Sequence, residues 1–221
     1  MADFEIREDE HGFGKVLIVK GPWSSDISDH MLKEGIYALR LTDSYGFKGE
    51  DLSFIPSLTY LKSLEIYCWD AKDVKLIEAL PQLEVLSLQF KSVRKIDLSA
   101  FLNLRFVFLT WTKGMDSILK LNSIEYLNIQ NYPYRTLQPI EHMINLKNLH
   151  LTSRKLETLE GIEKLKHLEV VDLYNCQKLI SKKGIEKCSS LKTIEIEACN
   201  KLSAYKCITR HGVSLIQLLA I

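Results

Sequence analysis

The chain contains 221 residues, with 29 Lys and Arg against 28 Asp and Glu, so its formal net charge is +1 when histidine is neutral. Hydrophobic residues make up 46% and charged residues 26% of the sequence. This composition is ordinary for a globular protein and excludes large-scale disorder, a collagen helix and a long coiled coil. The near-zero charge gives no reason to expect a nucleic acid or a membrane surface as the partner.

Targeting signals and cysteine usage favour a cytoplasmic protein. The segment 1–14 is acidic where a secretory signal begins with basic residues, and the first apolar run, Val16 to Val19, is far too short. No stretch approaches the roughly 18 apolar residues of a transmembrane helix. The odd number of cysteines and the lack of a CxxC pair predict reduced, buried thiols and neither disulfides nor a zinc site. They are Cys68, Cys176, Cys188, Cys199 and Cys207.

Residues 1–35 are expected to form a β-hairpin followed by a short helix. The segments DFEIR (3–7) and KVLIVKG (15–21) have strand composition and flank a turn that contains Gly12 and Gly14. The segment SSDISDHMLKEG (24–35) begins with capping residues and ends at Gly35, which is typical of a helix.

From residue 36 onward, aliphatic anchors recur in the order anchor, two residues, anchor, one residue, anchor. The pattern occurs eight times, and successive first anchors lie 20 to 25 residues apart. The triplets are Ile36-Leu39-Leu41, Leu61-Leu64-Ile66, Leu83-Leu86-Leu88, Leu104-Val107-Leu109, Ile124-Leu127-Ile129, Leu146-Leu149-Leu151, Leu168-Val171-Leu173 and Leu191-Ile194-Ile196. The alternating part predicts a short strand with one buried face, and stacked units predict a parallel sheet with a continuous core.

The remainder of each period has to return the chain within about a dozen residues, so we expect short helical or 3₁₀ turns there. Gly161 and Gly184 occupy matched places in two of these return segments, and each is followed by Ile-Glu-Lys. This agreement outside the strands strengthens the prediction of a repeat.

With these anchors, the chain resembles the leucine-rich repeat family, whose units follow LxxLxLxx(N/C)xL with a period of 20–29 residues. Units 168–179 (LEVVDLYNCQKL) and 191–202 (LKTIEIEACNKL) match best and place Cys176 and Cys199 at the Asn/Cys position. The resemblance implies an α/β solenoid with a curved parallel sheet on its concave face and short helices or 3₁₀ turns on its convex face. The period near 22 is similar to that of the short-repeat type.

Earlier units depart from the family pattern at the Asn/Cys position. Large or charged side chains there predict irregular, more open turns at the ends of those strands. The residues at this position are Ser44, Trp69, Lys91, Thr112, Tyr132 and Arg154.

We therefore expect a single domain over residues 1–221, with an N-terminal cap (1–35), eight repeats (36–202) and a C-terminal segment (203–221). One interpretation of the last segment is a partial ninth repeat or a final strand that covers the core. The other is an exposed strand edge that allows weak self-association. We therefore expect a monomer, or a weak homodimer formed through this edge.

Side chains between the inward anchors are expected to point out of the concave face and to form continuous ridges, since neighbouring strands lie about 4.8 Å apart. Val85, Phe106, Phe108 and Tyr126 are apolar or aromatic although the repeat does not require it, which favours an exposed binding patch over simple filling of a curved sheet. Further along, Asp172, Glu195 and Glu197 make the face acidic. The predicted partner-binding residues are Tyr67, Val85, Phe106, Phe108, Tyr126, Asn128, His150, Asp172, Tyr174 and Glu195.

Catalytic chemistry is not expected. His150 and Asp172 fall in one column on adjacent strands, so a His–Asp pair is possible, but no Ser or Cys nucleophile is placed to complete a triad. The sequence also lacks nucleotide-binding, zinc-protease and EF-hand motifs. Trp69 and Trp111 lie just beyond strand ends, where each is either a partner anchor or a turn-filling side chain.

The expected function is a non-enzymatic protein–protein interaction module without a cofactor, which binds a protein partner on its concave face and no nucleic acid or membrane. A free-standing repeat protein of this kind resembles an inhibitor or immunity-type blocker of a toxin or enzyme, and the acidic end of the face favours a basic partner. The alternative is an adaptor or scaffold subunit of a larger complex, which needs a second binding surface.

Overall fold

The computed structural model describes residues 3–91, 95–202 and 214–216. It divides into two compact units, Met1–Ile118 and Leu119–Ile221, which are described separately below as unit 1 and unit 2. Whether the two units make up the single domain expected from the sequence stays a prediction.

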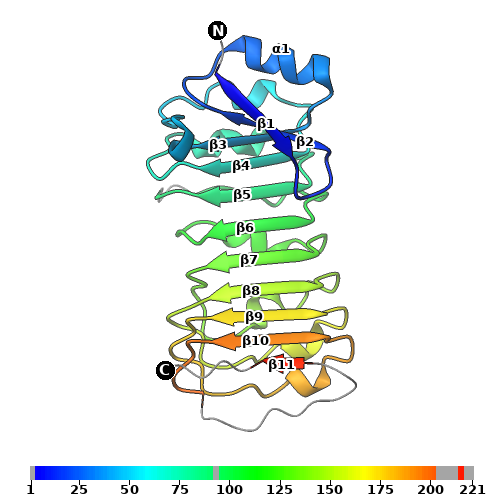
Figure 1. The fold of residues 1–221 in the computed structure, drawn as a ribbon. Helices are drawn as coiled ribbons and strands as arrows, with labels where there is room; N and C mark the ends of the chain where they lie inside the picture. The colour runs from blue at the N-terminus through cyan, green and yellow to red at the C-terminus, as the bar shows by residue number, and fades with distance from the viewer. Residues whose placement is uncertain (1–2, 92–94, 203–213, 217–221) are drawn as a thin grey trace. The chain divides into compact units, whose positions relative to one another are not determined.

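Unit 1 is built on a sheet of six strands and one α-helix (Figure 1). The strands are β1 (Phe4–Glu8), β2 (Lys15–Val19), β3 (Ala38–Thr42), β4 (Ser63–Tyr67), β5 (Val85–Gln89) and β6 (Phe106–Thr110). Strands β1 and β2 form the expected antiparallel hairpin. Strand β2 then pairs in parallel with β3, so the hairpin supplies the first strand of the parallel sheet, which continues in chain order to β6.

The helix α1 (Ser25–Glu34) connects β2 to β3 and buries Ile27 and Met31. It ends as predicted at Gly35, which adopts a left-handed conformation (φ 66°) and donates its N–H to the Leu32 carbonyl at 3.3 Å. The N-cap residue Ser24 makes no side-chain capping bond, so the N-terminal end of the helix is less well capped than the sequence suggests.

Unit 2 contains five strands that are parallel wherever their pairing is described. They are β7 (Tyr126–Gln130), β8 (Asn148–Thr152), β9 (Val170–Tyr174), β10 (Thr193–Glu197) and β11 (Ser214–Ile216). Strand β11 adds one strand beyond the eight predicted repeats, in line with a partial ninth unit. The rest of the predicted C-terminal segment, residues 203–213 and 217–221, lies outside the described residues, and so does its role in self-association.

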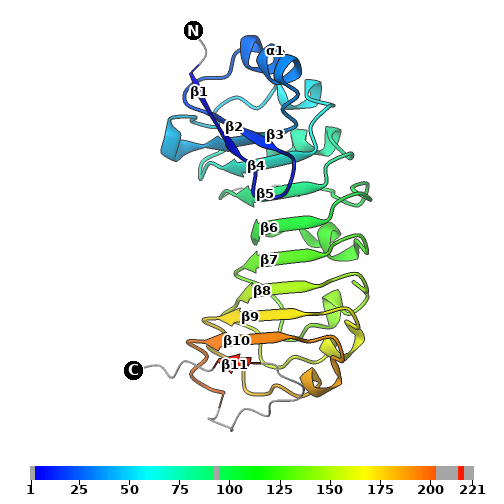
Figure 2. The same ribbon diagram turned by 45° about the vertical axis from the view of Figure 1, so that its right-hand side comes forward.

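The aliphatic anchors form the core of both units as predicted. Anchors of neighbouring strands pair directly, for example Leu64 with Leu86 and Leu127 with Leu149. The two anchors within each of the strands β3 to β10 are at most 2% exposed, apart from the half-buried Ile196. The repeated spacing therefore places one face of every strand in the core, and the opposite face, which points away from the 3₁₀ turns, is called the outer face below (Figure 2).

The return segments are 3₁₀ turns, as the sequence indicates. They are Asp43–Tyr45, Ile55–Ser57, Val74–Ala79, Asp116–Lys120, Gln138–Ile140, Ile162–Lys164 and Ile185–Lys187. Gly161 precedes one of them with φ 102°, and a Cβ atom there would lie only 2.7 Å from the backbone nitrogen of Gln138. The turn thus needs glycine both for its conformation and for the close approach of the preceding return segment.

The turns after the strands differ from the expectation of open, irregular ends. Asn131 and Asn175 adopt left-handed conformations (φ 62° and 54°), and the residues that follow them, Tyr132 and Cys176, are buried. Tyr132 fills the turn and donates its hydroxyl to the Thr136 carbonyl at 2.9 Å. In this repeat the large residue at the Asn/Cys position therefore points inward and closes the turn.

After β4, β5 and β8, which no left-handed residue follows, the preceding position turns inward instead. Cys68, Phe90 and Ser153 are buried in place of their neighbours Trp69, Lys91 and Arg154. Ser153 donates its hydroxyl to the Tyr132 carbonyl at 2.8 Å and accepts the N–H groups of Lys155 and Leu156 at 3.0 and 2.9 Å. It satisfies the turn backbone as the family's Asn/Cys residue does, one position earlier.

The cysteine side chains of the described residues are buried or half-buried, as the sequence predicts, while Cys207 lies outside them. Burial raises the pKa of Cys68 to about 12 and that of Cys188 to about 11. Cys199 is half-buried, and its hydrogen bond with Cys176 lowers its pKa. No helix in the described part of the chain has the length and apolarity needed to cross a bilayer.

The rates of thiol labelling should follow these differences in burial and pKa. At pH 8, iodoacetamide should modify Cys199 faster than Cys68 and Cys188, because a raised pKa leaves less thiolate and burial limits access. Peptide mass spectrometry at several times would measure each rate. Comparable labelling of Cys68 and Cys199 in the folded protein would contradict the described packing.

Truncating a core anchor should be costly, whereas truncating an exposed residue of the same unit should not. Leu149 is fully buried, so Leu149→Ala should lower the free energy of unfolding by about 2–5 kcal/mol. Ile180 is 59% exposed, and Ile180→Ala should change it by less than about 0.5 kcal/mol. Chemical denaturation followed by circular dichroism would compare the two variants.

Candidate functional site

The predicted partner-binding residues all lie on the outer face, but they are divided between the units. Tyr67, Val85, Phe106 and Phe108 lie on β4, β5 and β6 of unit 1. The residues on β7 to β10 of unit 2 are Tyr126, Asn128, His150, Asp172, Tyr174 and Glu195. The two groups differ in exposure, and each is considered in turn.

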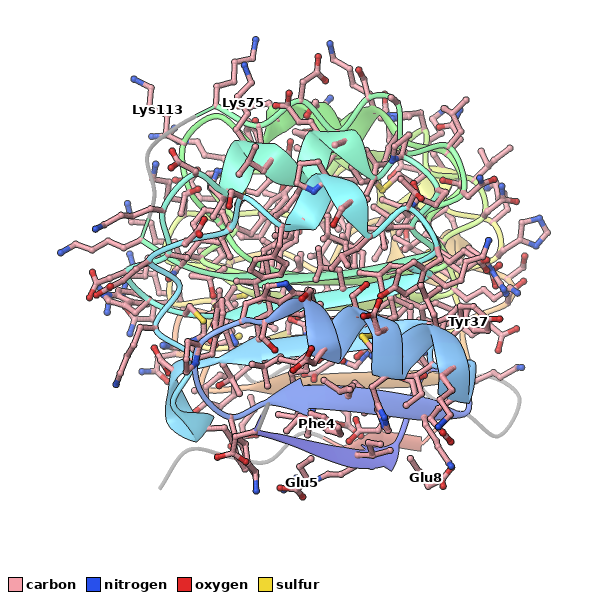
Figure 3. The ribbon with its side chains drawn as sticks, turned by 90° about the horizontal axis from the view of Figure 1, so that it is seen from above. Phe4, Glu5, Glu8, Tyr37, Lys75 and Lys113 are labelled. Carbon is pink, nitrogen blue, oxygen red and sulfur yellow. The ribbon has the colours of Figure 1, made fainter. Side chains whose placement is uncertain are left out.

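In unit 1 the hairpin loop lies over the outer face. This loop, residues 9–14 between β1 and β2, is called the hairpin loop below. The His11 ring lies with its centroid 5.2 Å from that of Phe108 and 5.8 Å from that of Phe106. Figures 1 and 2 show the hairpin crossing in front of the strands that follow it. In Figure 3, Glu5 and Glu8 of β1 lie on the opposite side of unit 1 from Lys75 and Lys113.

This cover changes the expected binding patch. Val85 is fully buried rather than exposed, and the neighbouring outward residues Ser63 and Ser87 are at most 1% exposed. Phe106 and Phe108 are half-buried beneath His11. The expectation of an exposed apolar patch that includes Val85 is therefore wrong, because the hairpin does more than cap the end of the stack.

A polar network runs across the outer face of unit 1. Arg40 on β3 donates two hydrogen bonds, at 2.9 and 3.1 Å, to the carboxylate of Glu65 on the adjacent strand β4. Tyr67 donates to Glu65 at 2.8 Å and accepts the Ser87 hydroxyl at 2.8 Å. The Glu65 side chain is only 1% exposed. Burial, together with the nearby Glu65 charge, raises the pKa of Tyr67. The network therefore satisfies its buried charge internally.

Sequence reasoning missed the contribution of His11, Arg40 and Glu65. The one feature of the sequence that could have indicated these contacts was the length of the hairpin loop. Two residues suffice for a tight hairpin, whereas this loop has six, including a histidine and a phenylalanine. Nothing in the local sequence indicates where such a loop lands.

In unit 2 the outer face is open and carries an ordered row of side chains on β7, β8 and β9. The Tyr126 and His150 rings are stacked, with centroids 4.9 Å apart and an interplanar angle of 21°. His150 Nδ1 lies 3.1 Å from a carboxylate oxygen of Asp172, which confirms the predicted His–Asp pair. Asn128 hydrogen-bonds the Tyr126 side chain, and burial raises the pKa of Tyr126. This Tyr–His–Asp row is half-exposed and held in place by its own contacts.

Beyond the Tyr–His–Asp row, the face becomes more exposed and acidic. Tyr174 is 49% exposed on β9. Glu195 and Glu197 are exposed on β10, where they pair in register with Asp172 and Tyr174. The structure thus brings the predicted acidic residues together beside an exposed aromatic ring.

The chemistry available on these faces is that of contact and charge. The Tyr–His–Asp row contains a base and a carboxylate but includes no nucleophile. Within the described ranges, no group of three or more His, Cys, Asp or Glu side chains is arranged to hold a metal ion. Trp69 is 50% exposed at the end of β4 while Cys68 fills the turn, so Trp69 is not a turn-filling side chain.

Comparisons with known proteins identify the fold. No family model and no curated protein matches the sequence. Among solved structures, an internalin C2 from Listeria monocytogenes is 21% identical, with a TM-score of 0.57 over 72% of this chain and 67% of that one. A leucine-rich repeat protein from Leptospira interrogans is 20% identical, with a TM-score of 0.44, and this chain covers 54% of its length. The protein has the leucine-rich repeat fold, as its anchors predict.

Breaking the Arg40–Glu65 ion pair should lower the free energy of unfolding more than breaking a more exposed ion pair does. Glu65→Gln removes the charge that compensates Arg40, so the free energy of unfolding should fall by about 2–4 kcal/mol. The control Glu84→Gln breaks the more exposed Lys62–Glu84 pair (3.4 Å) of the same unit and should cost less than about 1 kcal/mol. Urea denaturation of both variants measures the difference, and equal small losses would contradict a buried role for Glu65.

Proposed function

We propose that this protein is a non-enzymatic protein-binding module that recognises a protein partner through the outer face of unit 2. The observation that carries the proposal is the Tyr–His–Asp row, formed by Tyr126, His150 and Asp172 on three adjacent strands. Its side chains are half-exposed, and no repeat anchor requires them.

The row is suited to binding because it is held in one arrangement before a partner arrives. Stacking and hydrogen bonding already restrict the Tyr126 and His150 side chains. A partner therefore causes little additional loss of side-chain freedom at these positions. Aromatic residues surrounded by polar groups are also the usual composition of the residues that dominate binding energy.

The charge of the face favours a basic partner. Asp172, Glu195 and Glu197 present carboxylates next to the exposed Tyr174 ring. A Lys or Arg side chain can pair with the carboxylates and lie over the ring, and the negative face can steer such a partner during encounter. We infer a blocker of inhibitor or immunity type, because covering a basic toxin or enzyme requires a binding face and no further chemistry.

The first test is whether the row carries the binding. Wild type and Tyr126→Ala would be immobilised in equal amounts and used to capture partners from the native cell, and affinity for the captured protein would then be measured. Tyr126→Ala should weaken binding by about 2 kcal/mol or more, roughly thirtyfold. The control Ile144→Ala truncates a 56% exposed residue in a return segment of the same unit and should leave affinity unchanged. Equal affinity of all three proteins would rule out the row as the binding site.

The charge of the partner is tested separately. Reversing Glu195 and Glu197 to lysine should weaken binding and reduce its dependence on salt, because attraction between exposed charges is screened by ions. Binding that stays the same or strengthens would exclude a basic partner. Inhibition of the captured protein's activity identifies a blocker, whereas a captured complex that stays active and requires a second surface of this chain identifies an adaptor.

A further inference from the structure

The hairpin loop extends further than an end cap requires. A cap has to cover only the exposed end of a repeat stack, and β2 and α1 already lie there. Yet His11 contacts Phe106 and Phe108 on β6, and β3, β4 and β5 lie between β2 and β6 in the sheet. The loop therefore occupies the outer face of unit 1 rather than its end.

The burial of this face is best seen by comparison with equivalent positions in unit 2. On β4 and β5 the outward residues Ser63, Glu65, Val85 and Ser87 are at most 1% exposed. The equivalent residues on β7, β8 and β9 are all half-exposed, and they are Tyr126, Asn128, Asn148, His150, Val170 and Asp172. These strand positions are thus buried on β4 and β5 of unit 1 and half-exposed on β7, β8 and β9 of unit 2.

The hairpin loop keeps its shape without help from the face beneath it. The Asp9 N–H donates to the Gly14 carbonyl at 2.8 Å, and the Asp9 carboxylate accepts the N–H groups of His11 and Phe13 at 2.9 and 3.0 Å. No atom lies within 4 Å of the positions that a Cβ would take at Gly12 and Gly14, so the loop is not wedged between other segments there. The conformation of the loop is therefore supported by hydrogen bonds of its own backbone and of Asp9.

The loop contacts the face through a ring of its own. The His11 imidazole lies against the rings of Phe106 and Phe108 on β6. The loop thus presents an imidazole ring to a face that offers aromatic rings.

We propose that the hairpin loop is an internal ligand of the outer face of unit 1, and that a protein partner reaches this face only by displacing it. The external ligand that fits the uncovered face is a turn that presents an aromatic or imidazole ring to Phe106 and Phe108. This autoinhibitory contact is separate from the proposed function of unit 2, which does not depend on it.

The test uses the loop itself as the probe. In the shortened variant, an Asn-Gly turn replaces residues 9–14 and leaves both strands of the hairpin intact. The probe is a peptide of residues 8–15 closed by a disulfide between two added terminal cysteines, and the control peptide carries His11→Ala. Amide resonances of β5 and β6 in isotope-labelled protein report binding.

In the shortened variant, the probe should shift the β5 and β6 resonances in a saturable manner, and the control peptide should bind at least fivefold more weakly. Wild type should bind the probe at least tenfold more weakly, because an intramolecular ligand competes at an effective concentration of about millimolar. Failure of the folded variant to bind the probe, or equal binding by wild type, would overturn the proposal.

A second variant keeps the experiment decisive if the shortened hairpin does not fold. His11→Ala in the full chain removes the ring but retains the loop, and it should bind the probe at least threefold more tightly than wild type does. The control Ile6→Ala alters a partly exposed residue of β1 outside the loop and should behave as wild type. Equal binding by His11→Ala and wild type would show that the loop does not compete for the face.

Discussion

Burial of one face of every strand is the constraint on which the structure depends. A five-residue strand with two aliphatic anchors cannot bury them alone. Each repeat of about 22 residues is therefore stable only when it packs against neighbouring repeats. In-register pairing follows, as between Leu127 and Leu149, because a shift by one residue would move the anchors to the solvent side. Gly161 shows how closely the return segments must approach for this stacking.

The same constraint leaves the outer face free for other roles, and the two units use it differently. In unit 1 the hairpin loop covers a network centred on Arg40 and Glu65 and places His11 on two phenylalanines. In unit 2 the Tyr–His–Asp row is half-exposed, and Glu195 and Glu197 beside it are exposed. The outer face can therefore differ between the two units without disturbing the core.

Much of the fold could be predicted because its main signal is local and repeated. The strands β3 to β10, the 3₁₀ turns and the His150–Asp172 pair all follow from anchor spacing, since spacing determines both strand position and register. The turn ends were predicted less well. Ser153 replaces Arg154 as the inward residue because no left-handed residue follows β8, and backbone conformation at one position is a weak signal in a single sequence.

The sequence by itself determined the leucine-rich repeat fold and which residues point toward or away from the core, because a strand period of two and a regular repeat leave few alternatives. Only the tertiary structure decided which outward residues are accessible. Val85 and Tyr126 occupy equivalent strand positions, yet Val85 is buried and Tyr126 is half-exposed. The hairpin loop, more than 70 residues before Val85 in the chain, places His11 against Phe106, which pairs in register with Val85. This contact depends on the path of the backbone in space rather than on any residue near Val85 in the sequence.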